Sequence, residues 1–232
     1  MEDKKIRDSV KKFYNENASY WSTTRQSWWN DLAFIKDYLK EGGKLLDFGC
    51  GNGRLLELIN SLDEKVRQKI DYQGVDISSR LLNYAQEKYP KNKFKLIERE
   101  GELPFPDDSF DLVFSIAVFH HFSPKMAESA LIELKRVLKQ GGLIFLSGWC
   151  LGKGKHLREY QKQQIKLKEK GAAFLSFHEK KADSEEGRYY YRWELEEIVG
   201  LAKKIGLDVF GQGNTYSYQG EERNYYIAIK KV

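Results

Sequence analysis

Two acidic residues and three glycines in the first third of the chain have the spacing of a nucleotide-binding site. The stretch LLDFGCGNG, residues 45–53, carries Asp47 just before a glycine-rich turn. The glycines stand at alternate positions: Gly49, Gly51 and Gly53. Glycine allows a sharp turn and lets a ligand lie against the backbone. Asp76 follows at the spacing at which an acidic side chain accepts hydrogen bonds from a ribose.

The ligand that suits this arrangement carries a ribose and a positive charge. Dinucleotide sites use the spacing GxGxxG, whereas this turn has GxGxG, so an NAD-binding dehydrogenase is disfavoured. The carboxylate of Asp47 beside the turn would repel a pyrophosphate and attract a cation. S-adenosylmethionine (SAM) has a ribose, an adenine and a cationic amino-acid end, and it meets these conditions.

These residues need a sheet that brings the ends of successive strands together. Continuously apolar runs alternate with amphipathic stretches, which is typical of buried parallel strands and the helices that cover them. Strands are expected at 44–48, 72–76, 94–98, 110–116 and 143–149. Helices are expected at 54–62, 79–88, 125–138 (with Gly141 and Gly142 at its end) and 194–205. This order predicts an α/β fold with a mostly parallel sheet, which binds ligands at the carboxyl ends of its strands.

The chain outside this core is expected to form a cap, an insertion and a closing hairpin. Apolar residues recur at helical spacing before residue 42, and the runs 207–218 and 224–229 predict the hairpin. A helix is expected at 159–169 within a polar, basic segment. The expected parts of a single domain (1–232) are a helical cap at 1–41, a binding core at 44–149, a basic insertion at 152–187 and the C-terminal helix and hairpin at 188–232.

The composition is that of an ordinary globular protein, with 41% hydrophobic and 31% charged residues in a chain of 232. No run of 18 apolar residues occurs, so no membrane span is expected. The N-terminus is charged throughout and lacks the apolar core of a signal peptide, which favours a cytoplasmic location. Cys50 and Cys150 have no CxxC or metal-like partner, so we expect free thiols and no metal site.

Positive charge is concentrated in one part of a chain whose formal net charge is +5. Between Gly152 and Lys181 there are nine Lys or Arg residues against three Glu, a larger excess than that of the whole chain. From charge alone, a solvated helix surface is the favoured interpretation. The alternative is a surface that binds a polyanion such as RNA.

Four motifs in order resemble the class I SAM-dependent methyltransferases: LLDFGCGNGRLLELI, GVDIS, LPFPDDSFDLVFS and ELKRVLKQGGLIFLSGW. The resemblance implies a Rossmann-like fold with a seven-stranded sheet whose last strand is antiparallel. It implies that Asp47 and the glycines line the methionine end of SAM, Asp76 holds the ribose and Ile77 covers the adenine. The family has an acidic residue that meets the adenine amino group; Arg99 occupies its usual position, so we assign Glu100. The expected cofactor-binding set is Tyr20, Asp47, Gly49, Cys50, Gly51, Gly53, Asp76, Ile77, Glu100 and Ser115.

The outer regions resemble the methyltransferases that esterify 5-carboxymethyluridine at the wobble position of tRNA. The matching segments are YNENA (14–18), STTR (22–25), SIAVFHHFS (115–123), RYY (188–190) and NYY (224–226). Tyr191 departs from the group, which often has His there, and the acceptor is therefore left open. The resemblance implies tRNA as a partner. It also implies a small activator protein, because the eukaryotic relatives work with a zinc-binding one.

Methyl transfer to a carboxylate needs orientation and no base, because a carboxyl group with a pKa near ~4 is already ionised at neutral pH. Arg25 and Arg188 are the candidate catalytic cations, since a guanidinium grips two oxygens at once. On residue type alone, each is more readily a surface salt bridge. His121 either hydrogen-bonds the acceptor or packs the pocket wall.

Aromatic residues crowd the expected cap: Tyr14, Tyr20, Trp21, Trp28 and Trp29. Such rings either stack on a flipped wobble base or pack in the core, and we expect at least half of them to pack. Tyr20 is also a candidate for a cation–π contact with the sulfonium.

Three functions are open at this point. The leading one is SAM-dependent O-methylation of a carboxylate on a modified tRNA wobble uridine. A methyltransferase acting on small molecules would share residues 44–149 without needing the basic segment. A non-catalytic SAM-fold subunit that binds RNA or activates a partner is disfavoured, because it has no need to keep both Asp47 and Asp76.

Overall fold

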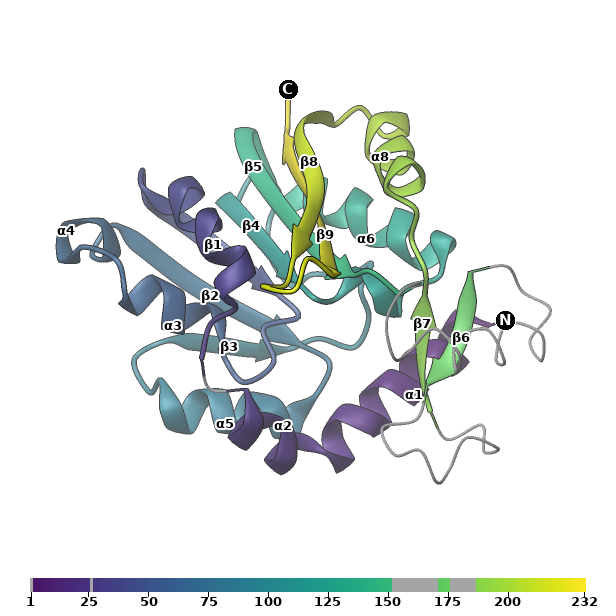
Figure 1. Ribbon diagram of the computed structural model, residues 1–232. Coiled ribbons are helices and arrows are strands. Elements are labelled where there is room, and N and C mark those ends of the chain that lie inside the picture. Colours follow the sequence, from purple (N-terminus) through teal and green to yellow (C-terminus); the bar gives the residue numbers. More distant parts are fainter. Residues whose placement is uncertain (1, 26, 152–170, 176–186) are drawn as a thin grey trace.

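The structure is a computed structural model that describes residues 2–25, 27–151, 171–175 and 187–232. It has a central sheet with helices on both faces (Figure 1). Most of the basic insertion predicted at 152–187, including its helix at 159–169, lies outside the described residues. In the part that is described, no helix is long and apolar enough to cross a membrane.

Seven strands form the central sheet in the order β3-β2-β1-β4-β5-β9-β8. Their bounds are β1 Gly43–Phe48, β2 Ile70–Asp76, β3 Lys93–Leu96, β4 Phe110–Ile116, β5 Leu138–Trp149, β8 Asp208–Tyr216 and β9 Glu222–Lys230. The strands from β3 to β5 pair in parallel, and β9 runs antiparallel to both β5 and β8. The prediction of a seven-stranded, mostly parallel sheet with an antiparallel last strand is confirmed.

The path of the chain across the sheet reverses between β1 and β4. From β1 the chain proceeds outward to β2 and β3, and β4 then returns to the other side of β1. Ligands bind such sheets at the carboxyl ends of the strands, at this switch point. Asp47 near the end of β1 and Asp76 at the end of β2 therefore lie at the edge where a ligand is expected.

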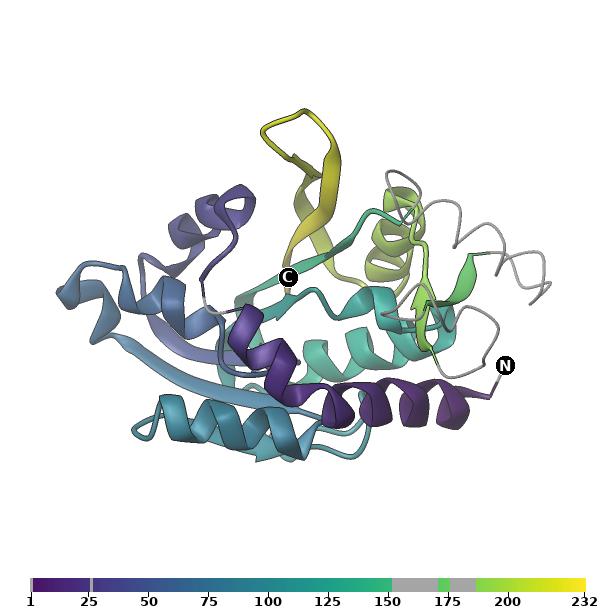
Figure 2. The same ribbon diagram turned by 60° about the horizontal axis from the view of Figure 1, so that its bottom comes forward.

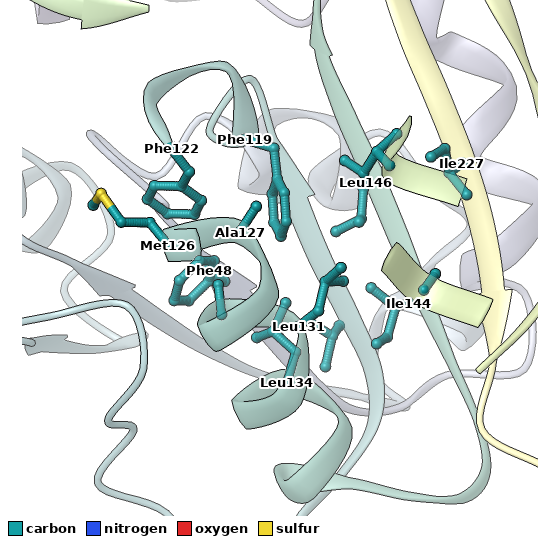
Figure 3. Packing of buried hydrophobic residues seen from close by; sticks show 14 of the residues in the cluster. Phe48, Phe119, Phe122, Met126, Ala127, Leu131, Leu134, Ile144, Leu146 and Ile227 are labelled. Carbon is teal, nitrogen blue, oxygen red and sulfur yellow. The ribbon is translucent and has the colours of Figure 1, made fainter. Parts of the chain in front are cut away.

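Side chains alternate between two hydrophobic cores along each buried strand. In β1, Leu46 belongs to the core on one face and Leu45 to the core on the other; in β5, Leu146 and Phe145 divide in the same way. Figure 3 shows the first core, where Leu131 and its neighbours pack against the strands. Because both faces are covered there, the central runs LVFSI of β4 and LIFLS of β5 are apolar at nearly every position.

The helices divide between the two faces of the sheet. The first core is covered by α1 (Asp3–Glu16), α6 (Pro124–Val137) and α8 (Leu195–Lys204). The second is covered by the 3-10 helix η1 (Asn30–Leu39) and by α3 (Leu55–Asn60). The remaining helices are α2 (Ala18–Thr24), α4 (Glu64–Arg67), α5 (Ser79–Lys88) and the 3-10 helix η2 (Phe119–His121). Figure 2 shows α1 and α2 following one another past α5, with which both are in contact.

Three local predictions need correction. The N-terminal stretch predicted as helical is divided into α1, α2 and η1. The helix predicted at 125–138 ends at Val137, within one residue of its expected end, but the strand predicted at 143–149 already begins at Leu138. Gly141, with φ +76°, and Gly142 therefore lie inside β5 and not at the end of the helix. An antiparallel ladder of β6 (Ala172–Leu175) and β7 (Arg188–Tyr191) was not predicted. It brings β7 against α1, where Figure 1 shows the two elements meeting.

Candidate cofactor and acceptor site

A cavity of about 490 Å³ lies at the carboxyl ends of β1, β2 and β4, under a cap made by α1, α2, Arg25, Trp28 and Trp29. This volume is in the range of small-molecule and cofactor sites. The predicted site residues that line it are Tyr20, Arg25, Asp47, Gly49, Cys50, Gly51, Asp76, Ile77, Glu100 and His121. Three predicted residues are not part of its wall: Gly53, Ser115 and Arg188.

The glycine turn is held in place by close packing and by backbone hydrogen bonds. Gly49 has φ +78°, and its N–H donates to the carbonyl of Val75 at 2.8 Å. A Cβ at Gly49 would lie 2.3 Å from Val118 Cγ2, so no side chain fits there. Gly51 also has a positive φ, but a Cβ there would meet nothing closer than Leu81 Cδ1 at 3.8 Å. The glycine at position 51 thus leaves open space on the cavity side of the turn.

Asp76 joins the end of β2 to the glycine turn. Its Oδ2 accepts a hydrogen bond from the backbone N–H of Gly51 and its Oδ1 accepts one from that of Ser78, both at 2.8 Å. Burial raises the pKa of Asp76, and these backbone donors oppose that rise. A carboxylate offers about four acceptor positions, so about two remain for hydroxyl groups of a ligand in the cavity.

Asp47 is a buried carboxylate held by one tyrosine. The hydroxyl of Tyr72 donates to Asp47 Oδ2 at 2.7 Å, and the residue is only 3% exposed. Burial raises the pKa of Asp47 to about 7; the Tyr72 hydrogen bond lowers it and the charge of Asp76 raises it. A cationic group in the cavity would favour the ionised form of Asp47, as expected for the ammonium of SAM.

Glu100 forms a bidentate ion pair that the sequence did not indicate. Arg7 Nε lies 2.9 Å from Glu100 Oε2, and Arg7 Nη2 lies 3.0 Å from Glu100 Oε1. Both residues line the cavity, so this pair ties α1 to the cofactor side of the site. The carboxylate keeps about two acceptor positions for the adenine amino group.

His121 has a protein partner at each ring nitrogen. Nδ1 lies 2.8 Å from the carbonyl oxygen of Tyr189, which can only accept, so we assign the proton to Nδ1. Nε2 is then an acceptor for the hydroxyl of Tyr14 at 2.9 Å. Burial and the charge of Arg188 lower the pKa of His121 to about 3, which keeps the ring neutral. Neither ring nitrogen is free to hydrogen-bond a methyl acceptor. Tyr14, which is bonded to the ring, also lines the cavity.

Arg188 is only 3% exposed and lies behind the cavity wall. Its guanidinium carbon lies 4.4 to 5.4 Å from five ring centroids, those of Phe13, Tyr14, Trp21, Trp149 and Tyr190. Among the described residues, one terminal nitrogen, Nη1, is buried without a hydrogen-bond partner, and no acidic side chain forms an ion pair with Arg188. Three of the rings, Tyr14, Trp21 and Trp149, also line the cavity. Arg188 is therefore not in direct contact with the cavity, although an acceptor contact was predicted for it, and its charge can act there only across these rings.

Two further guanidinium groups are part of the cavity wall and lie on tryptophan rings. Arg25 stacks on Trp21 and Arg54 stacks on Trp29, each with its guanidinium carbon 3.3 Å from the ring centroid. Burial lowers the pKa of Arg25, and the charge of Arg188 lowers it further. Arg54 was not predicted as a site residue, although it is the first residue after the glycine turn.

The remaining predicted residues have simpler surroundings. Ser115 is buried in β4, and its hydroxyl has no partner in the described part of the chain. Gly53 packs near Tyr89. Cys50 lines the cavity, and burial raises the pKa of its thiol, which keeps it protonated. Over the described ranges, no group of three or more His, Cys, Asp or Glu side chains is arranged to hold a metal ion.

The charges of the cavity are separated into two regions. Asp47, Asp76 and Glu100 come from the sheet side, whereas Arg25 comes from the cap and Arg54 from the helix side of the glycine turn. The sheet side fits SAM, because it offers carboxylates to an ammonium, a ribose and an adenine amino group beside an open turn. The guanidinium groups fit a second, anionic molecule.

Comparisons with known proteins agree with this assignment. The family model described as "Methyltransferase domain" matches residues 46–146. A protein of Encephalitozoon cuniculi, named as a methyltransferase, is 31% identical over 96% of this chain and 95% of its own length. A SAM-dependent methyltransferase structure from Methanosarcina mazei superimposes with a TM-score of 0.71 at 22% identity, covering 89% of this chain and 99% of that one.

A more specific relative is the tRNA (carboxymethyluridine(34)-5-O)-methyltransferase of Arabidopsis thaliana. It is 33% identical over 61% of this chain, and the match spans 32% of the plant protein. The chain therefore covers about a third of the length of this relative.

The fold, the glycine turn with its two aspartates and these matches define a class of enzyme that transfers methyl groups from SAM. The chain belongs to the class I SAM-dependent methyltransferases, and SAM is its cofactor. It resembles the tRNA carboxymethyluridine methyltransferases within that class.

Proposed function

We propose that this enzyme O-methylates a carboxylate on a modified wobble uridine of tRNA. The observation that carries the proposal is the pair of guanidinium groups, Arg25 and Arg54, on the wall of the cavity that also contains Asp47 and Asp76. Neither arginine has an ion-pair partner among the described residues. An anionic acceptor supplies the missing charge, and the name of the plant relative supports a carboxymethyluridine.

We assign the cofactor-facing roles to the carboxylates of the sheet side. Asp47 attracts the ammonium of the methionine moiety, and Asp76 accepts hydrogen bonds from the ribose. The glycine turn leaves room for the ligand at Gly51. Bound SAM supplies a methyl group on a positively charged sulfur, which is open to displacement by a nucleophile.

Arg25 is the proposed contact to the acceptor carboxylate. A guanidinium binds both oxygens and orients them, and the acceptor needs no base because it is already ionised. His121 cannot serve as a base through a free nitrogen, since both of its nitrogens are used. It is a positioning residue for Tyr14, which forms the wall beside Arg25.

The partners proposed for this function are tRNA and a small activator protein. The test is methyl transfer from radiolabelled SAM to bulk tRNA from cells that lack this protein, followed by nucleoside analysis. A base-labile methyl ester on a uridine is the expected product. No label in tRNA, with SAM binding intact and with activator candidates added, would overturn the tRNA assignment in favour of a small carboxylic acid.

Variants separate the two regions of the cavity. Asp76→Ala is expected to abolish SAM binding, because it removes the ribose acceptor and leaves two backbone N–H groups unpaired. Arg25→Ala is expected to leave SAM binding intact and to reduce turnover. Full activity of the Arg25 variant would contradict its role as the acceptor contact.

A further inference from the structure

Arg54 has donors that the protein does not use. It follows the glycine turn directly and lines the cavity. Its Nε donates to the carbonyl of Ser27 at 2.6 Å, and its guanidinium lies flat on Trp29. In the described part of the chain, its two terminal amino groups have no hydrogen-bond partner. The side chain is thus fixed at one edge while its other donors remain available.

The charged surroundings of Arg54 favour the arrival of an anion. Burial and the nearby charge of Arg25 together lower the pKa of Arg54 to about 10. The acid that opposes this effect is Asp31, whose Oδ2 already accepts hydrogen bonds from Thr215 at 2.6 Å and from Asn224 at 2.8 Å. Two half-buried cations thus lie near each other, and Asp31 is the described acid that acts on Arg54.

A second unused donor lies in the same wall. The indole N–H of Trp28 is buried and has no hydrogen-bond partner within the described residues, and Trp28 lines the cavity. Its ring packs edge-on against Trp29, the ring that supports Arg54. An indole N–H can only donate, as can a guanidinium. Donors of this kind suit a ligand rich in acceptor oxygens.

We propose that Arg54 and Trp28 form a second anion subsite, separate from the carboxylate contact at Arg25, and that it binds a backbone phosphate of the acceptor RNA. This inference rests on the proposed function. Phosphate oxygens are the usual partners of arginine in nucleic-acid complexes, where they fix the position of the strand. Arg54 is partly exposed, as a contact to a strand that enters from solvent requires. The methionine carboxylate of SAM is the other anion of suitable chemistry, and the experiment separates the two.

The experiment measures SAM and tRNA binding by wild type, Arg54→Gln and a matched control, Arg67→Gln. Arg67 is an exposed arginine of α4 that is absent from the cavity wall. SAM affinity is measured by calorimetry, and tRNA affinity by filter binding between about 50 and 200 mM salt. For Arg54→Gln we expect about tenfold weaker tRNA binding and a salt slope smaller by about 0.7, as for one lost phosphate contact. Its SAM affinity is expected to stay within about twofold of wild type, and the Arg67 control is expected to match wild type in both assays.

Other results would overturn the inference in distinguishable ways. Wild-type tRNA affinity and salt slope in the Arg54→Gln variant would exclude a phosphate contact. A loss of SAM affinity with unchanged tRNA binding would assign Arg54 to the cofactor carboxylate. If wild type itself binds no tRNA, the proposed function fails together with the phosphate assignment. Should Arg54→Gln not fold, Arg54→Lys keeps the charge without the planar stack, and it is expected to retain the wild-type slope with weaker binding.

Discussion

Replacing Arg188 with methionine tests whether a buried guanidinium serves the acceptor or the fold. The guanidinium lies among five aromatic rings without an acidic partner in the described chain. Desolvation of an unpaired cation costs several kcal/mol, while each ring contact returns about 0.5 to 2 kcal/mol. These opposing contributions are of similar size. We therefore expect Arg188→Met to change the free energy of unfolding by no more than about 2 kcal/mol.

The effect on activity follows from Coulomb's law. A carboxylate on the far side of one aromatic ring lies about 8 Å from the guanidinium, and at an effective dielectric constant of about 20 the attraction is about 2 kcal/mol. Loss of this attraction corresponds to about a 30-fold change in binding. Because methyl transfer consumes the negative charge of the acceptor, the field of Arg188 favours the bound acceptor over the transition state. The expected result is a KM for the acceptor about 30-fold higher, with kcat unchanged or up to about threefold above wild type.

The assays are urea unfolding, SAM calorimetry and steady-state methyl transfer. Arg192→Met is the matched control, since Arg192 is on the surface and pairs with Glu194 at 3.0 Å. A loss of 4 kcal/mol or more in stability with an unchanged KM would refute the reasoning and make Arg188 a structural residue. An equal rise in KM for the Arg192 control would show that any lost positive charge has this effect.

Three further predictions follow from the glycine turn and its surroundings. Gly49→Ala is expected to lower the free energy of unfolding by about 2 to 4 kcal/mol, because the added Cβ meets Val118 and the backbone is left-handed. Gly141→Ala, whose Cβ meets nothing within 4 Å, is expected to cost about 1 kcal/mol, and equal losses for the two variants in urea denaturation would contradict this reasoning. The affinity for SAM, measured by calorimetry across pH, is expected to fall as the pH drops through about 7, because the carboxylate of Asp47 gains a proton and no longer attracts an ammonium. Asp47→Asn is expected to remove this pH dependence, and a variant that kept it would contradict the role of Asp47. Tyr14→Phe leaves Nε2 of His121 as a buried acceptor without a donor and is expected to lower the free energy of unfolding by about 1 to 3 kcal/mol. An unchanged midpoint in urea would show that this hydrogen bond does not stabilise the fold.

The sequence predicted the parts of the site that depend on local order. The strand at 110–116 was placed correctly because its apolar run is unbroken, and Asp76 was found because a fixed number of residues separates it from the glycine turn. The glycine turn and Asp76 lie within one strand–helix–strand unit, where local spacing determines position. The boundary at Gly141 was missed because a glycine pair also suits the end of a helix, and here it lies within a strand.

Contacts between distant segments could not be predicted in this way. The ion pair between Arg7 and Glu100 joins residues 93 positions apart. Arg188 is buried because the strand pairing of 172–175 with 188–191 places it on the aromatic cap, and neither segment shows a strong strand pattern. The hydrogen bond from Nδ1 of His121 to the chain at Tyr189 depends on the same pairing. Such features require the tertiary structure.

The separation of charge across the cavity has a consequence for turnover under the proposed function. The guanidinium of Arg25 holds the acceptor while the acceptor carries a negative charge, and esterification removes that charge. The ester product then faces a half-buried cation with no counter-charge, which disfavours its binding. The arginine that recruits the acid therefore also promotes release of the ester, provided that no neighbouring acid neutralises it. An arginine lying on Trp21, with no acidic partner among the described residues, meets this condition, whereas an arginine in a salt bridge would not.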